Sequence, residues 1–294
     1  MSSVEPVGLV GTGLLGTALA DRLLDDQFPV LVFNRTPAKA APLLARGAIW
    51  CDNPLASCRR VIFSLFTADQ VEQLFEQMNS KPLDGRIVVD TSTSDPRQTI
   101  AVGTRLAAHG VKYLEAPFSG SSEQTRNRMA TALIAGDHAT FTACHDLWKC
   151  LAAHAYYVGP WGNAAKMKLV TNLVLGLNRA ALAEGLVLAE AAGLNTENAL
   201  HVLLNSPAYS RTMDAKGPKM VEGDFSPQAR LSQHIKDVRL MLEEAARGGV
   251  TLPISSLHLK LLEQAEAAGL GQLDNSAIIR VIQDPKLRTM MSQS

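Results

Sequence analysis

A glycine-rich hexapeptide near the start constrains this chain more than any other feature. It directly follows the short apolar run Val7 to Val10 and opens a helix-like segment. In such a strand–turn–helix context the first glycine permits a tight turn, the second lets a phosphate approach the backbone, and the third lets the helix pack closely on the strand. The anion then rests on the helix N-terminus. The sequence therefore predicts a dinucleotide site formed by Gly11, Thr12, Gly13, Leu14, Leu15 and Gly16.

The rest of the first half alternates short apolar runs with helix-like segments. The predicted strands are Val7 to Val10, Val30 to Phe33, Val61 to Leu65, Ile87 to Asp90, Tyr113 to Glu115 and Ala132 to Ala135. The predicted helices between them include Thr17 to Asp25, Ala68 to Met78 and Arg97 to His109. Such alternation builds a parallel sheet covered by helices. The fold class is therefore predicted as α/β, with an N-terminal doubly wound Rossmann-type domain.

The second half has a different pattern, dominated by helix-like segments. Ala164 to Ala192 runs for about 29 residues without proline, and Gly193 is placed to end it. At 1.5 Å per residue this helix spans roughly 43 Å, enough to connect two domains. Further helices are expected at Thr196 to Asn205, Leu231 to Arg247, Pro253 to Ala268 and Asn275 to Gln283. We predict an NADP-binding domain over residues 1–162 and an all-α substrate and dimerisation domain over residues 163–294.

Charge, apolar runs and cysteines narrow the class of partner. Lys plus Arg and Asp plus Glu both number 28, so the footprint of a nucleic-acid or anionic-membrane binder is missing and a small-molecule partner is expected. We expect no secretory signal and no membrane-spanning run. The four cysteines form no CxxC pair, which predicts reduced thiols in a cytoplasmic protein without a metal site. The alternative is a bridge between Cys144 and Cys150. The long apolar helix favours a homodimer or homotetramer.

The end of the second predicted strand bears on the choice of cofactor. Enzymes that use NAD usually present Asp or Glu here to the ribose 2′-hydroxyl, whereas this chain has Asn34-Arg35-Thr36. Arg35 can meet a 2′-phosphate through its planar donor fork, and Asn34, Thr36 and Lys39 can add donors. The segment therefore favours NADP(H); the alternative is that Arg35 is a solvated turn residue. Leu65, at the end of the third predicted strand, is a further expected cofactor contact.

The long helix opens with two lysines and an asparagine. Lys168 and Asn172 are four residues apart and share one helical face, whereas Lys166 lies about 200° from Lys168 around the axis. A lysine at a domain junction can give a proton to a carbonyl oxygen, and burial would lower its pKa toward a useful range. The alternative from spacing alone is an exposed polar stripe.

The ordered motifs resemble the β-hydroxyacid dehydrogenase family over nearly the whole chain. The landmarks are Gly11 to Gly16, Asp90-Thr91-Ser92-Thr93, Glu115 to Ser121, Gly162 to Asn172 and Lys236-Asp237-Val238-Arg239-Leu240. The resemblance implies that Lys168 is the catalytic acid/base and that Asn172 organises substrate. It also implies that Ser119, Gly120 and Ser121 bind the substrate carboxylate, and that Thr93 and Lys236 contact the nicotinamide half of the cofactor.

Departures from the family pattern bear on the substrate. Many members carry two glycines after the serine, whereas Gly120-Ser121 is similar to the glyoxylate and succinic semialdehyde reductase branch. Phe118 replaces a small aliphatic residue, and residues 122–128 do not follow that branch. Arg126 or Arg128 can pair with a substrate carboxylate, although a surface role is the ordinary one for each.

Four functions are therefore compared. The leading hypothesis is NADPH-dependent reduction of a small aldehyde acid, such as glyoxylate or succinic semialdehyde, with Lys168 as general acid. Oxidation of a 3-hydroxy acid such as 3-hydroxyisobutyrate is an alternative. An imine reductase shares the glycine fingerprint, but that group commonly has Asp or Tyr where this chain has Lys168. A non-catalytic interaction protein with the same fold is disfavoured by the same lysine.

Overall fold

The computed structural model describes residues 5–78 and 83–284, and its contacts divide the chain into two compact units. The first unit is Met1–Lys168 and the second is Leu169–Ser294. The units part inside helix α9 (Asn163–Ala191), whereas the sequence placed the domain boundary just before that helix. Lys168 therefore closes the first unit and Asn172 belongs to the second.

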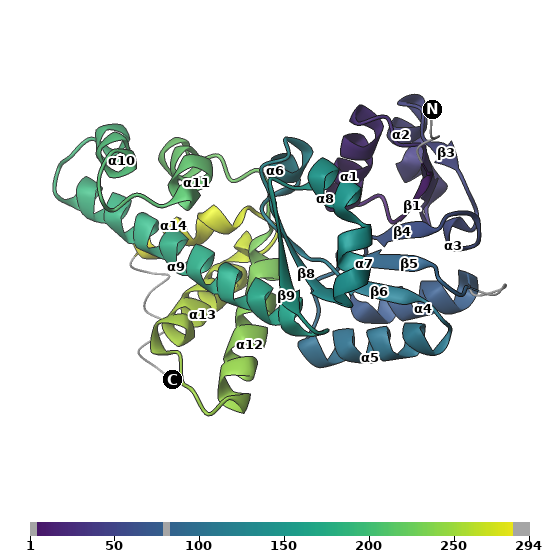
Figure 1. Ribbon diagram of the computed structural model, residues 1–294. Coiled ribbons are helices and arrows are strands. Elements are labelled where there is room, and N and C mark those ends of the chain that lie inside the picture. The colour runs from purple at the N-terminus through teal and green to yellow at the C-terminus, as the bar shows by residue number, and fades with distance from the viewer. Residues whose placement is uncertain (1–4, 79–82, 285–294) are drawn as a thin grey trace. The chain divides into compact units, whose positions relative to one another are not determined.

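The first unit is built on a nine-stranded sheet (Figure 1). Its strands follow the order β3-β2-β1-β4-β5-β6-β8-β7, with β9 paired to β8. Their bounds are β1 Val7–Val10, β2 Val30–Phe33, β3 Ile49–Trp50, β4 Arg60–Phe63, β5 Ile87–Asp90, β6 Lys112–Glu115, β7 Phe118–Ser119, β8 Thr131–Gly136 and β9 His154–Gly159. The chain moves outward from β1 in one direction and then the other, which is the doubly wound arrangement that the sequence predicted.

The sheet is not parallel throughout, which corrects the sequence interpretation. Strands β1 to β6 pair in parallel, but β8 runs antiparallel to both β6 and β7. Three strands, β3, β7 and β9, were not predicted. Two of them have only two residues, too short to show a period. In β9 the exposed and partly exposed residues follow no regular alternation.

Helices cover both faces of this sheet, because its central strands are apolar on both sides. Leu9 and Val32 face a core closed by α1 (Leu14–Asp25) and α8 (His145–Leu151). Val61 and Val88 face a second core closed by α4 (Ala68–Met78) and α5 (Pro96–Ala108). In Figure 1 these two pairs of helices lie on opposite sides of the strands. Shorter helices are η1 Pro37–Ala40, α2 Ala41–Ala45, α3 Pro54–Ser57, α6 Ser122–Arg126 and α7 His138–Ala143.

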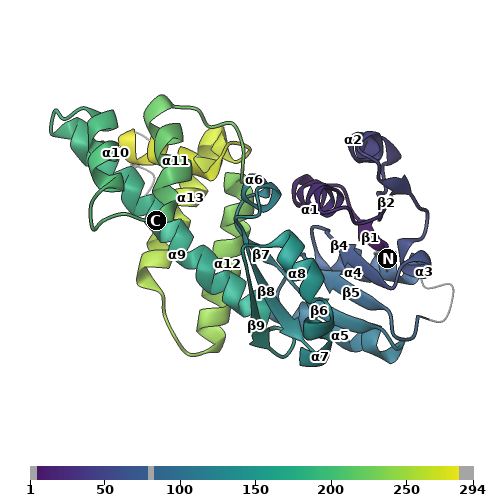
Figure 2. The same ribbon diagram turned by 45° about the horizontal axis from the view of Figure 1, so that its top comes forward.

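The second unit is helical in its described residues (Figure 2). After α9 it contains α10 Thr196–Leu204, α11 Arg211–Glu222, α12 Leu231–Arg247, α13 Pro253–Ala265, the π-helical turn η2 Glu266–Leu270, η3 Asn275–Ile278 and α14 Ile279–Gln283. Its core gathers apolar residues of α9 and the later helices, including Leu182, Leu231 and Leu262. Helix α11 was not predicted, because Gly217 and Pro218 in its interior read as helix breakers.

Among the described residues, helix α9 is long and apolar enough to cross a membrane, by length and composition only. This corrects the expectation that no run reaches that length. The core helix of a soluble protein passes the same test. Leu169, Leu182 and Leu186 of α9 pack into the core of the helical unit, and 33% of its most apolar window is buried.

Candidate functional site

The glycine-rich turn has the backbone that its three glycines predict. Gly11 has a φ of +101°, and a Cβ there would overlap the carbonyl oxygen of Ser64. A Cβ on Gly16 would overlap the carbonyl oxygen of Gly11. Gly13, in contrast, would direct a Cβ into open space. Two glycines therefore allow close packing, and the third leaves the backbone open to a ligand.

The surroundings of this turn fit the pyrophosphate of a dinucleotide. Gly13 is the N-cap of α1, so the first amides of a 12-residue helix surround the open position. The hydroxyl oxygen of Thr12 is buried and has no hydrogen-bond partner in the described part of the chain. Leu14 is 72 % exposed beside it, while Leu15 packs on the core. A bound ligand would give the hydroxyl of Thr12 a hydrogen-bond partner and would cover the side chain of Leu14.

Asn34 supports the turn rather than facing solvent. Its Oδ1 accepts from the backbone N–H of Thr12 at 3.0 Å, and its Nδ2 donates to the carbonyl oxygen of Thr36 at 2.8 Å. The amide that was expected to contact the cofactor thus ties the end of β2 to the glycine turn. Arg35, Thr36 and Lys39 are exposed next to it, where a ribose 2′-substituent would be accessible.

The end of β5 adds a buried polar group. Asp90 accepts from the N–H of Ser92 at 2.9 Å and from the hydroxyl of Tyr113 at 2.8 Å, and burial raises the pKa of its carboxyl. The hydroxyl of Ser92 is buried without a partner among the described residues. Thr93 follows, partly exposed, and Leu65 at the end of the neighbouring β4 is also partly exposed. The carboxyl ends of parallel strands are where cofactors bind in such sheets.

The expected carboxylate-binding segment is divided between a strand and a helix cap. Ser119 ends β7, and Gly120 follows with a φ of +145°. The hydroxyl of Ser121 accepts from the N–H of Gln124 at 3.0 Å, and the N–H of Ser121 donates to Oε1 of Gln124 at 2.9 Å. This capping box engages both polar groups of Ser121. Ser119 and Gly120 thus remain the better candidates for direct anion contact.

The two arginines that follow are held by the first unit itself. Arg126 pairs with Asp21 at 3.2 Å and with Asp25 at 2.6 Å, both on α1. Arg128 has a φ of +55° and directs Nε toward the carbonyl oxygen of Ala152 at 3.5 Å. Their contacts favour the ordinary surface role over substrate binding.

Lys168 is brought to the segment that the sequence linked to the substrate carboxylate. Its side chain is buried, with the residue 8 % exposed, and Nζ donates to the carbonyl oxygen of Phe118 at 2.5 Å. Phe118 immediately precedes Ser119. Lys166, two positions earlier on α9, is exposed. The two lysines of the motif therefore differ as the helical period predicts, and one of them lies beside Ser119.

Glu115 fixes the start of the helix that carries Lys168, a role that the sequence reasoning missed. Its carboxylate accepts from the N–H of Gly162 at 2.7 Å and from the N–H of Ala165. Burial raises the pKa of this carboxyl to about 7, and the backbone donors oppose that rise. A carboxylate at a helix N-terminus is stabilised by the helix dipole. The signal available in the sequence was a single carboxylate at the end of a predicted strand.

In the second unit, Asn172 is anchored by the Lys236-Asp237 motif. Nδ2 of Asn172 donates to Oδ2 of Asp237 at 3.1 Å, and Asp237 is buried on α12. Lys236 is partly exposed next to it. The motif thus positions the asparagine that follows Lys168 by one helical turn.

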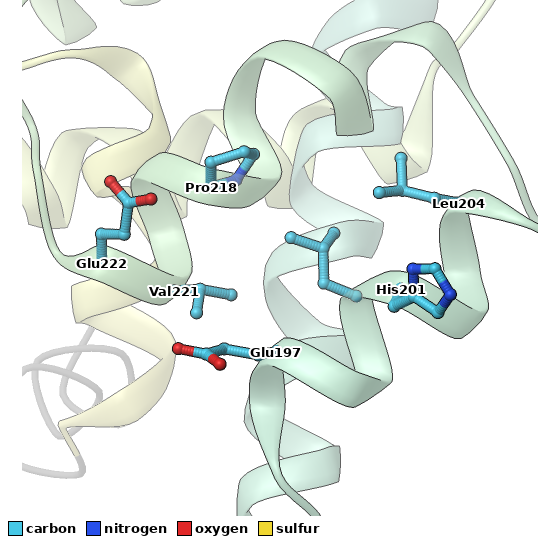
Figure 3. Close-up of a pocket in the computed structure, with 7 residues that line it drawn as sticks. Glu197, His201, Leu204, Pro218, Val221 and Glu222 are labelled. Atoms are coloured by element: carbon cyan, nitrogen blue, oxygen red, sulfur yellow. The ribbon is translucent and has the colours of Figure 1, made fainter.

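A separate hollow of about 250 Å³ lies between α10 and α11 (Figure 3). It is lined by Glu197, Leu200, His201, Leu204, Pro218, Val221 and Glu222. Figure 3 shows the carboxylates of Glu197 and Glu222 near Val221, and His201 beside Leu204. None of the expected site residues lines this hollow. Among the described residues no three His, Cys, Asp or Glu side chains are grouped to hold a metal ion.

Comparison with protein families divides the chain at nearly the same place as its contacts do. Residues 6–159 match the family described as the NAD-binding domain of 6-phosphogluconate dehydrogenase. Residues 162–282 match the family described as NAD-binding of NADP-dependent 3-hydroxyisobutyrate dehydrogenase. Together the two matches cover the glycine turn, the Ser119 segment, α9 and the Lys236-Asp237 motif.

Whole proteins of known activity are similar over almost their full length. Glyoxylate/succinic semialdehyde reductase 1 of Arabidopsis thaliana is 30% identical, with 94% of this chain and 98% of the relative covered. The 2-(hydroxymethyl)glutarate dehydrogenase of Eubacterium barkeri is 32% identical, with 94% of each covered. A crystal structure of 3-hydroxyisobutyrate dehydrogenase from Salmonella typhimurium has a TM-score of 0.86 at 25% identity, covering 94% of this chain and 99% of that one. The chain belongs to the β-hydroxyacid dehydrogenase family and is an NAD(P)-dependent oxidoreductase.

Proposed function

We propose that this protein reduces a small aldehyde acid to the hydroxy acid with NADPH, and that Lys168 is the proton donor. Glyoxylate and succinic semialdehyde are the substrates that we favour. The observation that carries the proposal is the hydrogen bond from Nζ of Lys168 to the carbonyl oxygen of Phe118. It sets the ammonium group beside Ser119, so an acid and an anion-binding segment are available to one short substrate.

Each residue then has a chemical task. Ser119 and Gly120 hold the substrate carboxylate through hydroxyl and backbone N–H groups. Lys168 delivers a proton to the aldehyde oxygen as negative charge develops there, which is general acid catalysis. Asn172, whose side chain donates to Asp237, is assigned to organising the substrate. When bound, the nicotinamide supplies the hydride that reduces the carbonyl carbon.

The same residues support the reverse reaction. A lysine that donates a proton to an alkoxide can accept one from an alcohol when it is neutral, so oxidation of a 3-hydroxy acid uses the same geometry. Reduction is favoured because the relatives include a reductase of glyoxylate and succinic semialdehyde. The glutarate dehydrogenase supports a longer, branched hydroxy acid as the second candidate.

The preference for NADPH is argued from the exposed end of β2. No carboxylate stands in Asn34-Arg35-Thr36 to accept from a ribose 2′-hydroxyl, and the exposed Arg35 can pair with a 2′-phosphate. Asn34 contributes indirectly, because its side chain holds the turn instead of the nucleotide. The NADP-dependent family that matches residues 162–282 supports the same choice.

The test is a comparison of substrates at fixed NADPH. Oxidation of NADPH is followed by absorbance with glyoxylate, succinic semialdehyde and a cyclic imine, and reduction of NADP⁺ is followed with 2-(hydroxymethyl)glutarate. The proposal expects the highest kcat/KM with one of the two aldehyde acids. Turnover of the imine alone would contradict it, and a preference for the hydroxy acid would move the protein to the second candidate.

A further inference from the structure

Arg179 of α9 is a buried cation without a direct partner in the described part of the chain. The residue is 4 % exposed, and its Nε and Nη2 are both shielded from solvent with no hydrogen-bond acceptor there. Buried charges in folded proteins are paired, and buried donors are hydrogen-bonded. The unpartnered edge of this guanidinium group therefore lacks a hydrogen-bond acceptor inside the helical unit.

Two histidines flank the same stretch of α9. His234 of α12 and His258 of α13 both pack against Gly176, and their ring centroids are 5.2 Å apart. A Cβ on Gly176 would lie 2.6 Å from Nε2 of His234, so the missing side chain admits the two rings. Both histidines are buried, and Nε2 of each has no partner among the described residues. Three helices thus carry four unpartnered nitrogens, and the charge of Arg179 acts on both histidines.

The charges around this region leave the guanidinium edge available. Burial lowers the pKa of Arg179 to about 10, while the charges of Asp274 and Asp237 oppose that change. Asp274 is already paired with Lys216 at 2.8 Å, and Asp237 accepts from Asn172 at 3.1 Å. Both acids therefore have hydrogen-bond partners of their own.

The histidines are neutral at ordinary pH. Burial and the charge of Arg179 lower the pKa of His258 to about 4, and they hold the pKa of His234 well below its usual range. A neutral imidazole can carry its proton on Nε2 and donate it. The region thus holds one fixed positive charge and two neutral donors.

We propose that Arg179, His234 and His258 form a binding site for a carboxylate. The Nε–H and Nη2–H bonds lie along one edge of the planar guanidinium, which matches the two oxygens of a carboxylate. The imidazole N–H groups are the further donors to those oxygens. A carboxylate here would give these four nitrogens an acceptor, and it would give Arg179 the counter-charge that its burial requires.

On two of its three helices the site is close to Asn172 and Asp237, which belong to the proposed reaction. Gly176 follows Asn172 by four residues on α9, about 6 Å along the axis, and His234 precedes Asp237 by three residues on α12. The carboxylate can come from two sources, and for the first of them the inference rests on the proposed function. It is the second carboxylate of a dicarboxylic semialdehyde, or it is a separate small carboxylate such as a product.

The binding experiment needs no turnover, so its outcome is independent of the proposed function. Succinate is titrated into the full chain by calorimetry at constant ionic strength, with sodium chloride as the reference. We expect saturable binding that weakens at least tenfold in Arg179→Met and partly in Arg179→Lys, which keeps the charge but loses the planar fork. Arg239→Met, at an exposed position of α12, serves as the matched control and should bind as the unaltered protein does.

Kinetics then separate the two sources. If the substrate supplies the carboxylate, Arg179→Met raises KM at least tenfold for a dicarboxylic semialdehyde and leaves KM for succinic semialdehyde unchanged. If a separate carboxylate binds, neither KM changes although succinate binding is weakened. The proposal is overturned if succinate does not bind the unaltered protein, or if Arg179→Met binds it equally well. Ordered water would then be the partner of Arg179.

Discussion

Nζ of Lys168 donates a hydrogen bond of 2.5 Å to the carbonyl oxygen of Phe118, which joins positions that are 50 residues apart in the sequence. Phe118 begins β7 and Ser119 ends it, so the hydrogen bond holds the ammonium group at the residue that precedes Ser119. Glu115, which ends β6, holds the start of α9 through the N–H of Gly162, so α9 is tied to β7 through Lys168 and to β6 through Glu115. The geometry leads to four predictions and one central test.

The two glycines of the turn should separate folding from cofactor binding. Gly13→Ala introduces a methyl group into open space, so the protein should keep its thermal midpoint without cofactor and lose at least tenfold in NADPH affinity. Gly16→Ala introduces a methyl group against the carbonyl oxygen of Gly11 and should destabilise the fold by about 1–3 kcal/mol. Scanning fluorimetry and NADPH fluorescence titration measure the two effects. Equal loss of stability in both variants would contradict this division.

Arg35 should decide between the two nicotinamide cofactors. Its side chain is exposed, so Arg35→Ala should fold normally. Loss of a charge-assisted contact of about 1.5–3 kcal/mol corresponds to a rise of roughly 10- to 100-fold in KM for NADPH. KM for NADH should stay the same. Lys149→Ala, at an exposed position of α8 outside the proposed cofactor site, is the control. An equal rise for both cofactors in Arg35→Ala would argue against a 2′-phosphate contact.

Glu115 should make stability fall as the pH rises from weakly acidic to neutral. Its pKa in the folded protein, about 7, lies above the value of 4.5 expected in the unfolded chain. The folded state therefore binds the proton more tightly, and this contribution is complete below pH 4.5 and lost as the pH passes about 7. By order of magnitude the contribution is about 3 kcal/mol.

Thermal midpoints of the unaltered protein and of Glu115→Gln, measured from pH 5 to pH 8, test this directly. The glutamine cannot titrate, so the difference in stability between the two proteins should change with pH in the direction given above. A difference that stays constant over this range would show that Glu115 is ionised throughout. Buried histidines titrate in both proteins and cancel in the comparison.

A buried ion pair should dominate the stability of the helical unit. Lys216 of α11 lies 2.8 Å from Asp274, whose side chain is fully buried and also accepts from the N–H groups of Gln228, Ala229 and Ser276. Lys216→Met leaves that carboxylate without its counter-charge and should cost about 3–5 kcal/mol. Adding Asp274→Asn should recover part of the loss, as urea unfolding would measure. An additive loss in the double variant would mean that the pair is not coupled.

The sequence was sufficient for the parts of the fold that rest on local pattern. The strands at Val7–Val10, Val30–Phe33 and Ile87–Asp90 have the predicted bounds, because each is a continuous apolar run between breakers. Strand β7 could not be predicted in this way. Its two residues become a strand through pairing with β8, and pairing is a tertiary contact.

Site residues could be predicted where they all lie in one short motif. They could not be predicted where the contacting residues are far apart in the sequence. The glycine turn is local, so Gly11, Gly13 and Gly16 could be assigned from spacing. The contact of Lys168 with Phe118 joins two motifs, and no spacing rule gives it. Lys216 and Asp274 are 58 residues apart in segments with no distinctive pattern, so only the fold reveals them.

The most direct measurement of the central claim compares Lys168→Ala with Lys166→Ala. The two lysines are on the same helix, and one is buried beside Ser119 while the other is exposed. In Lys168→Ala, the rate of NADPH oxidation with the best aldehyde acid should fall by about 10²- to 10⁴-fold while NADPH still binds. Lys166→Ala should retain nearly full activity. If Lys168→Ala stays active, or if both variants lose activity equally, the proton comes from another group and Lys168 is not the acid.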